Sequence, residues 1–216
     1  MTEKNFKKIL ICLTIYISSL FAANTLGIKL MPFIFGTHLS VAIFSFPIIF
    51  IMTDVIGEVY GKKMAKNFVL AGIISIILFI LYSAISSVMP WSEKGTWVKE
   101  GYNQIFGLSV RFSIASLMAF VIAEYQDVFS FFFFKKKFGD RFFWLRSNLS
   151  NIWSQLLDST IFMLIAYVGI LPLKTILLII IPWWLYKVFI GFLYTPLSYL
   201  GVHLLKEKNL NENPTN

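Results

Sequence analysis

Three ionisable side chains lie inside long apolar stretches of this sequence: Glu124, Asp158 and Lys187. Each is at least 11 residues from the nearest flanking Lys or Arg along the chain. At about 1.5 Å per residue, this spacing predicts that each lies at middle depth in an apolar helix. A carboxylate at that depth can accept paired N–H donors from a ligand, exchange a proton, or form an ion pair with the lysine.

A polar stripe precedes and includes Asp158. Asn148, Asn151, Gln155 and Asp158 follow the spacing i, i+3, i+7, i+10, which places them on one face of a helix. Such a face must lie against other helices or water. For Asn148 and Asn151 we expect interhelical hydrogen bonds. For Gln155 and Asp158 the spacing leaves two interpretations, hydrogen bonds between helices or a substrate site.

Lys187 is expected to neutralise one carboxylate, either Asp158 or Glu124, and to leave the other without a counter-ion. The remaining acid could bind the donor edge of a ligand, or take and release a proton. Pro182 opens the segment PWWLYK, in which Trp183, Trp184 and Tyr186 precede the lysine. An aromatic wall here would suit a flat ring, and packing at the membrane interface is the alternative.

Two further acids, Asp54 and Asp127, stand towards one end of their apolar stretches, and Asp127 shares a helical face with Glu124. We predict that Asp54 faces Asp127 and belongs to an inner gate or polar pathway. Glu58 is four residues before Lys62, so a surface ion pair between them is expected at the inner interface.

The elements that must position these groups are membrane-spanning helices. The chain has 216 residues, 57% hydrophobic and 14% charged, with a mean hydropathy of +0.74. Its apolar stretches predict an all-α, polytopic membrane protein with one transmembrane domain over residues 1–216. The six predicted spans are residues 9–28, 39–56, 67–89, 112–134, 149–170 and 175–201. Pro47, Pro182 and Pro196 predict interruptions of the second and sixth spans.

The distribution of basic residues predicts the orientation. With both termini inside, 13 of the 19 Lys and Arg residues fall in segments facing the cytoplasm. The same asymmetry accounts for the net charge of +8, so we predict membrane lipid and no nucleic acid as a partner. Phosphate-binding loops and common hydrolase motifs are missing, and the lone Cys12 excludes an internal disulfide. We therefore expect no enzyme activity, cofactor or metal.

Several segments resemble the queuosine precursor transporter family, also called the vitamin uptake transporter family. They are FSFPIIFIMTD at 44–54, VRFSIASLMAF at 110–120, the Asp127-Val128 pair, SQLLDSTIF at 154–162 and YKVFIGFLYTP at 186–196. The resemblance runs in order from the second predicted span to the sixth.

The resemblance implies an importer of the bacterial inner membrane for 7-deazaguanine intermediates of queuosine synthesis, in their cyano and aminomethyl forms. The positions that match the family pattern are Asp54, Arg111, Asp127, Asp158 and Lys187, with Gln155 where the family carries an amide. Glu58 and Glu124 fall at positions that vary in the family. The guanine-like edge, with N1–H beside an amino group, would pair with Asp158, and its carbonyl would meet Lys187 or Gln155.

Two other functions compete with a gradient-driven importer. A substrate-binding subunit of an energy-coupling-factor vitamin transporter also has about six spans, but it would need separate ATPase partners. A membrane scaffold would use the polar stripe for helix association alone. The sequence leaves the coupling ion and the oligomeric state open, a homo-oligomer included.

Overall fold

The computed structural model describes residues 3–26, 29–32, 38–106, 110–139, 141–169 and 172–206. Six long helices make up most of this part of the chain: α1 (Glu3–Leu26), α2 (Phe46–Tyr60), α3 (Lys62–Val88), α5 (Val110–Phe138), α6 (Phe143–Tyr167) and α7 (Leu173–Leu205). Short elements join them: β1 (Leu30–Pro32), β2 (His38–Ser40), η2 (Val41–Phe44), η3 (Glu93–Val98) and α4 (Lys99–Phe106). Each predicted span overlaps one of the six long helices.

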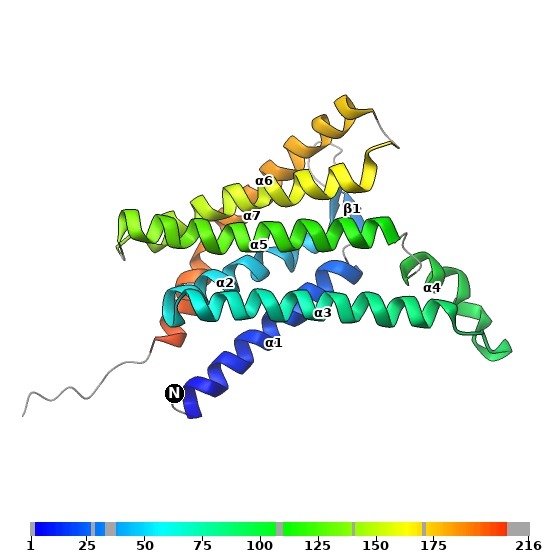
Figure 1. Ribbon diagram of the computed structural model, residues 1–216, viewed down its shortest axis with the longest axis horizontal. Helices are drawn as coiled ribbons and strands as arrows, with labels where there is room; N and C mark the ends of the chain where they lie inside the picture. Colours follow the sequence, from blue (N-terminus) through cyan, green and yellow to red (C-terminus); the bar gives the residue numbers. More distant parts are fainter. Residues whose placement is uncertain are drawn as a thin grey trace, which may run out of the picture.

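The long helices lie side by side in one bundle (Figure 1). The shortest of them, α2, contacts α1, α3, α5, α6 and α7, and most of its residues from Pro47 to Gly57 are buried. It is therefore the central helix, and the other five surround it. Side chains that point away from α2 in any direction enter the interior of the bundle, which is why its two acids, Asp54 and Glu58, can reach partners on other helices.

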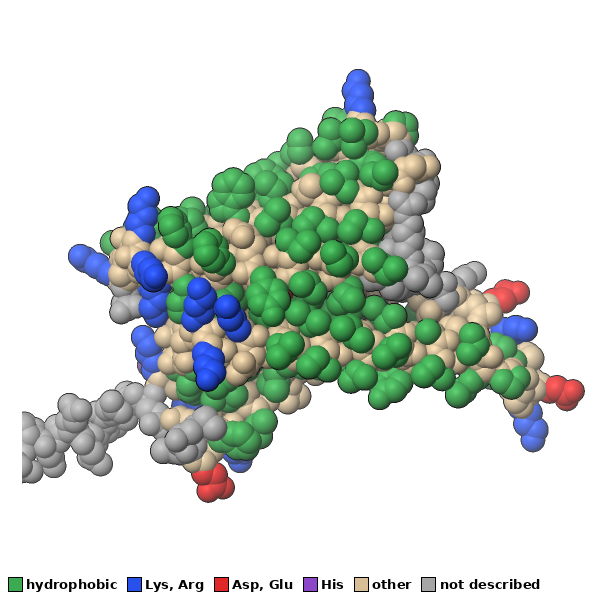
Figure 2. Space-filling model, viewed as in Figure 1, with side chains coloured by type: hydrophobic (Ala, Val, Ile, Leu, Met, Phe, Trp, Pro, Cys, Tyr) green, Lys and Arg blue, Asp and Glu red, His purple; other side chains and the backbone are tan. Residues whose placement is uncertain are grey.

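The outer surface is apolar, as a lipid-facing surface must be (Figure 2). Helix α7 exposes Leu178, Phe189 and Leu204, and α3 exposes Leu70 and several other aliphatic side chains. Within the described residues, five helices are long and apolar enough to cross a membrane, with bounds Glu3–Leu26, Val41–Tyr60, Lys62–Val88, Ile114–Phe138 and Leu173–Leu205. The prediction of an all-α polytopic membrane protein is confirmed.

Helix α6 reverses the usual pattern of a soluble amphipathic helix. It buries mostly polar residues, such as Arg146, Ser150 and Asp158, and exposes large apolar ones such as Trp153. These polar residues lower its hydropathy, so α6 is not among the five candidate spans although it has 25 residues. Small serine side chains on α6 permit its extensive contact with α5. A sixth span at α6 stays a prediction.

Most of the Lys and Arg side chains visible in Figure 2 gather at one end of the bundle, which we call the basic end. Lys8 Nζ near the start of α1 donates to the Leu204 carbonyl near the end of α7, at 2.7 Å. Glu58 at the end of α2 bonds to Lys135 of α5 and Arg146 of α6. The ends of these five helices therefore meet at the same side, and that this side faces the cytoplasm stays a prediction.

Prolines affect the helices differently from the prediction. Pro47 does not interrupt a helix but stands in the first turn of α2, where its missing N–H costs no helical hydrogen bond. Residues 38–44 form β2 and η2, so the helix begins later than the predicted span at 39. Helix α7 runs through Pro182 and Pro196 without a break. Neighbouring groups can satisfy the freed carbonyls of a membrane helix, so proline need not end it.

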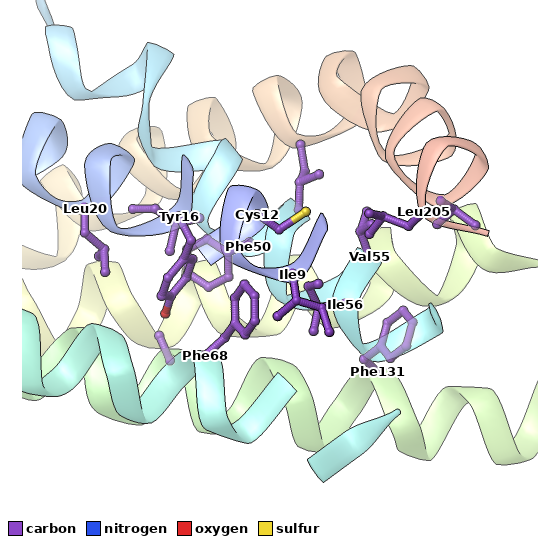
Figure 3. Close-up of a cluster of buried hydrophobic side chains, with 14 of the residues drawn as sticks. Ile9, Cys12, Tyr16, Leu20, Phe50, Val55, Ile56, Phe68, Phe131 and Leu205 are labelled. Carbon is purple, nitrogen blue, oxygen red and sulfur yellow. The ribbon is translucent and has the colours of Figure 1, made fainter. Parts of the chain in front are cut away.

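Tyr16 connects α1 to α3 inside the apolar core (Figure 3). Its ring lies beside Phe68, with the centroids 5.7 Å apart, and its side chain is fully buried. The helices approach closely because residue 72 is glycine. A methyl carbon on Gly72 would lie 2.8 Å from the Tyr16 hydroxyl and 3.0 Å from Leu20 Cδ1.

We expect Gly72→Ala to destabilise the protein. The buried Tyr16 cannot move aside, so an overpacking cost of about 1–3 kcal/mol exceeds the gain of about 1 kcal/mol in helix propensity. Thermal unfolding in detergent measures the difference. The matched control is Gly101→Ala in α4, where nothing lies within 4 Å of the added methyl. Equal or higher stability of Gly72→Ala would contradict the close contact of α1 and α3.

Candidate functional site

A cavity of about 560 Å³ lies between the helices at the end of the bundle opposite the basic residues. That volume is in the range of small-molecule sites. Its wall is largely apolar and aromatic, with Phe46, Phe120, Phe162, Trp183 and Tyr186 among its residues. A small polar set interrupts this wall: Asn24, Ser116, Asn151, Gln155, Asp158, Ser159 and Lys187.

The charged part of the wall is an ion pair. Lys187 Nζ of α7 lies 2.5 Å from Asp158 Oδ2 of α6, and the two side chains are 17% and 11% exposed. The ammonium also lies 4.5 Å from the centre of the Phe46 ring of α2. Of the two pairings that the sequence allowed for Lys187, the structure has the one with Asp158. Three helices thus meet at one charged group, and a ligand in the cavity can contact it.

Two polar atoms next to this ion pair lack hydrogen-bond partners among the described residues. They are Gln155 Oε1 and Ser159 Oγ, and both side chains are buried. The Gln155 amide nitrogen donates weakly to Asn151 Oδ1, at 3.4 Å. Because buried polar atoms are nearly always bonded, these groups in a cavity wall are suited to bind the polar edge of a ligand.

Asp54, Glu124 and Asp127 do not line the cavity but lie between it and the basic end of the bundle. Ser147 Oγ donates to Asp54, and Ser154 Oγ donates to Asp127 Oδ1 at 3.0 Å. The carboxyl groups of Asp54 and Asp127 are close enough to share a hydrogen bond. Their positions agree with the prediction that they face each other, and a role in a gate or pathway stays a prediction.

Glu124 lies one turn of α5 nearer the cavity than Asp127. Its side chain is fully buried, and neither carboxyl oxygen has a hydrogen-bond partner in the described part of the chain. Thr53 of α2 is adjacent, but its hydroxyl donates to the Phe50 carbonyl, at 2.9 Å. Glu124 is therefore the carboxylate that Lys187 leaves without a counter-ion.

Glu58 forms the centre of a second charged group, at the basic end. Its Oε2 accepts from Lys135 Nζ at 2.9 Å and from an Arg146 guanidinium nitrogen at 2.8 Å. Arg146 is fully buried, lies 5.5 Å from the centre of the Phe131 ring, and also donates to the Gly139 carbonyl. We call these three residues, Glu58, Lys135 and Arg146, the inner network.

The predicted pair of Glu58 with Lys62 is wrong. Gly61, with a φ of 86°, ends α2, and Lys62 begins α3. The i, i+4 rule holds only within one helix, so a break at Gly61 removes the pairing. Lys62 Nζ lies instead over the Phe129 ring, 5.8 Å from its centre.

The remaining predicted residues divide into three groups. Trp183 and Tyr186 line the cavity, whereas Trp184 does not, because its Nε1 donates to the Ile152 carbonyl of α6 at 2.9 Å. Asn148 donates to Thr195 Oγ1 of α7 at 2.9 Å, the interhelical bond expected for it. Arg111 belongs to α5, but its side chain lies outside the described residues.

Part of the cavity wall consists of residues that were not predicted from the sequence. Asn24 and Ser116, joined by a hydrogen bond of 3.1 Å, line it from α1 and α5, and Phe46 and Phe120 supply aromatic faces. Single serines and phenylalanines are common in membrane helices, so the sequence alone does not indicate which of them line a cavity. Asn24, an amide at the end of an apolar stretch, could have been identified by its polarity.

Comparisons with known proteins identify relatives of this chain. The sequence model of a family described as putative vitamin uptake transporter matches residues 40–201. A probable queuosine precursor transporter of Bacillus subtilis (strain 168) is 29% identical over 174 residues, covering 80% of this chain and 75% of that protein. The queuosine precursor transporter of Escherichia coli (strain K12) is 31% identical over 141 residues, covering 65% of this chain and 60% of that protein.

No solved structure matches the chain. The family model covers most of the chain, from β2 to near the end of α7, and includes every residue of the charged wall of the cavity and of the inner network. Because this match covers most of its length, the chain belongs to the family of putative vitamin uptake transporters.

Proposed function

We propose that this protein imports queuosine precursors, 7-cyano-7-deazaguanine and 7-aminomethyl-7-deazaguanine, across the inner membrane as a gradient-driven transporter. The observation that carries the proposal is the Asp158–Lys187 pair in the wall of a largely aromatic cavity, in a chain related to proteins named queuosine precursor transporters. The single transmembrane domain has six spans, α6 included.

The chemistry of the ligand fits the cavity wall. A 7-deazaguanine presents an N1–H and an amino group side by side, and a carboxylate accepts both at once. Asp158 supplies that carboxylate, and Lys187 offsets its charge in the absence of ligand. The ring carbonyl of the ligand would meet Lys187, the Gln155 amide or the Ser159 hydroxyl. Phe46, Trp183 and Tyr186 supply faces for the flat ring.

We also propose that the basic end of the bundle faces the cytoplasm, with both termini inside. The cavity is lined by Asn24 and Tyr167, near the ends of α1 and α6 that would then face outward. The inner network would close the cytoplasmic side. The structure would then correspond to a state in which the site is reached from outside, and import would require the inner network to open.

Labelling of single cysteines tests this orientation. Starting from Cys12→Ser, which removes the only native cysteine, we expect Glu93→Cys in η3 to react with a membrane-impermeant maleimide on intact spheroplasts. Lys4→Cys should react only after permeabilisation. The Cys12→Ser parent is the control for background. The reverse labelling pattern would refute the N-in, C-in topology.

Uptake tests the substrate. In a host that cannot make queuosine precursors but keeps the later steps, this chain should restore queuosine in tRNA when 7-cyano-7-deazaguanine is supplied. Asp158→Asn should prevent restoration at low supply. Loss of hydrogen bonds to a charged group costs about 1.5–3 kcal/mol, or about 10- to 100-fold in affinity.

Glu100→Gln, an exposed change in α4, is the matched control, and membrane levels of each variant are measured. Uptake that survives Asp158→Asn would remove the role of this carboxylate. Restoration that requires added ATPase subunits would favour the energy-coupling-factor type of transporter. No binding of the compound by purified protein would contradict the proposed function.

A further inference from the structure

The carboxyl groups of Asp54, Glu124 and Asp127 form a cluster that substrate binding does not use. We call these three residues the acid cluster. All lie inside the bundle, with exposed fractions of 2%, 0% and 0%. Both oxygens of Glu124 and Oδ2 of Asp127 have no hydrogen-bond partner among the described residues. Unpaired carboxyl oxygens at this depth are costly, and ionisable groups retained there are usually functional.

The groups that face the acid cluster are neutral or acidic. Helix α1 contributes Tyr16, whose hydroxyl is near Glu124 and Asp127 and lies against Gly72 of α3. Helix α2 adds Thr53, and α6 adds the hydroxyls of Ser147, Ser150 and Ser154 together with the acid Asp158. On either side the basic groups are already paired, Lys187 with Asp158, and Lys135 and Arg146 with Glu58.

Three carboxylates cannot all remain ionised in such a place. The carboxyl groups lie close together, and their mutual repulsion is strong in a medium of low dielectric constant. The nearby cations Lys187, Lys135 and Arg146 already pair with other acids. Asp54 and Asp127 are near neighbours, and two carboxyl groups in this position repel each other unless one of them carries a proton. The acid cluster must therefore hold at least one proton or another cation.

The position of the cluster connects the cavity to the basic end. Glu124 is close enough to Asp158 for their charges to interact, so a ligand that changes the contacts of Asp158 also changes the field at Glu124. Asp54 is four residues before Glu58 on α2, and hence on the same face as the centre of the inner network. One end of the acid cluster is thus adjacent to the cavity, and the other end is adjacent to the inner network. In an importer, these are the two places that must open and close.

We propose that Glu124, with Asp127 and Asp54, binds the proton whose inward movement drives uptake. This inference rests on the proposed function as an importer. A carboxylate of the cluster takes a proton from the outer side while the cavity is open to that side. The resulting neutral carboxylic acid no longer repels its neighbours. The proton leaves to the cytoplasm once the inner network opens, which restores the carboxylate.

A proton fits the cluster better than a metal ion. No group of three His, Cys, Asp or Glu residues in the described ranges is arranged to hold a metal ion. Sodium and other hard cations need several converging oxygens. Here Asp54 and Asp127 accept from serine hydroxyls of α6, whereas a proton needs only one oxygen of Glu124.

Infrared spectroscopy of the purified protein in lipid tests proton binding without any substrate. A protonated carboxylic acid has a carbonyl stretching band that a carboxylate lacks. We expect this band at neutral pH in the native protein, with part of its intensity lost in Glu124→Gln and none lost in Glu100→Gln. A native protein without the band, or a Glu124→Gln band of full intensity, would overturn the proposal.

Transport into proteoliposomes tests coupling, with 7-cyano-7-deazaguanine as the probe. If one proton moves with each substrate, a pH gradient of about one unit, acidic outside, supports about tenfold accumulation. Glu124→Gln should reduce the ratio of inside to outside concentration to about one, while binding of the probe stays measurable. Glu124→Asp, which keeps a titratable group, should recover part of the accumulation. Glu100→Gln should accumulate the probe like the native protein.

The possible failures are distinguishable. Native protein that accumulates the probe equally with and without the pH gradient, or only with a sodium gradient, overturns proton coupling but leaves the importer. Accumulation that survives Glu124→Gln overturns the assignment to this residue. If the native protein neither binds nor transports the probe, the proposed function is refuted, and so is the proposal of proton coupling.

Discussion

The cost of burying charge in a bundle surrounded by hydrocarbon is the constraint on which the rest of the structure depends. An ionised group inside such a bundle needs a partner, because hydrocarbon supplies none. The structure meets this requirement at two levels, with Lys187 for Asp158 and with Lys135 and Arg146 for Glu58. Between these levels the acid cluster has only hydroxyl groups and its own carboxyls, and the outer surface is left to apolar side chains.

The central position of α2 follows from the same constraint. A helix with two acids separated by one turn could not face lipid, and α2 avoids it by contacting all five of its long neighbours. The turn at Gly61 then separates Glu58 from the lysines of α3, so that the acid pairs across the bundle instead of along its own helix. A pair across helices fixes their relative position, which a pair within one helix does not.

Periodicity and length predicted the features that depend on a single helix. They indicated the apolar helices and the shared face of Asn148, Gln155 and Asp158. They also limited the partner of Lys187 to Asp158 or Glu124. Features that depend on how helices are placed could not be predicted in this way. The partners of Glu58 come from two other helices, Trp184 faces a carbonyl of α6 rather than the cavity, and Ser116 lines the cavity only because α1 and α5 approach there.

Helix α6 contributes side chains to all three groups of polar contacts: the inner network, the acid cluster and the charged wall of the cavity. From its start towards its end, Arg146 belongs to the inner network, Ser147 and Ser154 bond to the acid cluster, and Asp158 pairs with Lys187 at the cavity. Hydrogen bonds form only over a narrow range of donor–acceptor distances, about 2.7–3.2 Å for N–H···O, so a shift of α6 by an ångström or more against α2 and α5 would break hydrogen bonds at all three levels together. In contrast, its exposed apolar side chains can slide against lipid at little cost. A helix that is polar inside and apolar outside can therefore move as one body that changes the contacts of the inner network, the acid cluster and the cavity wall together.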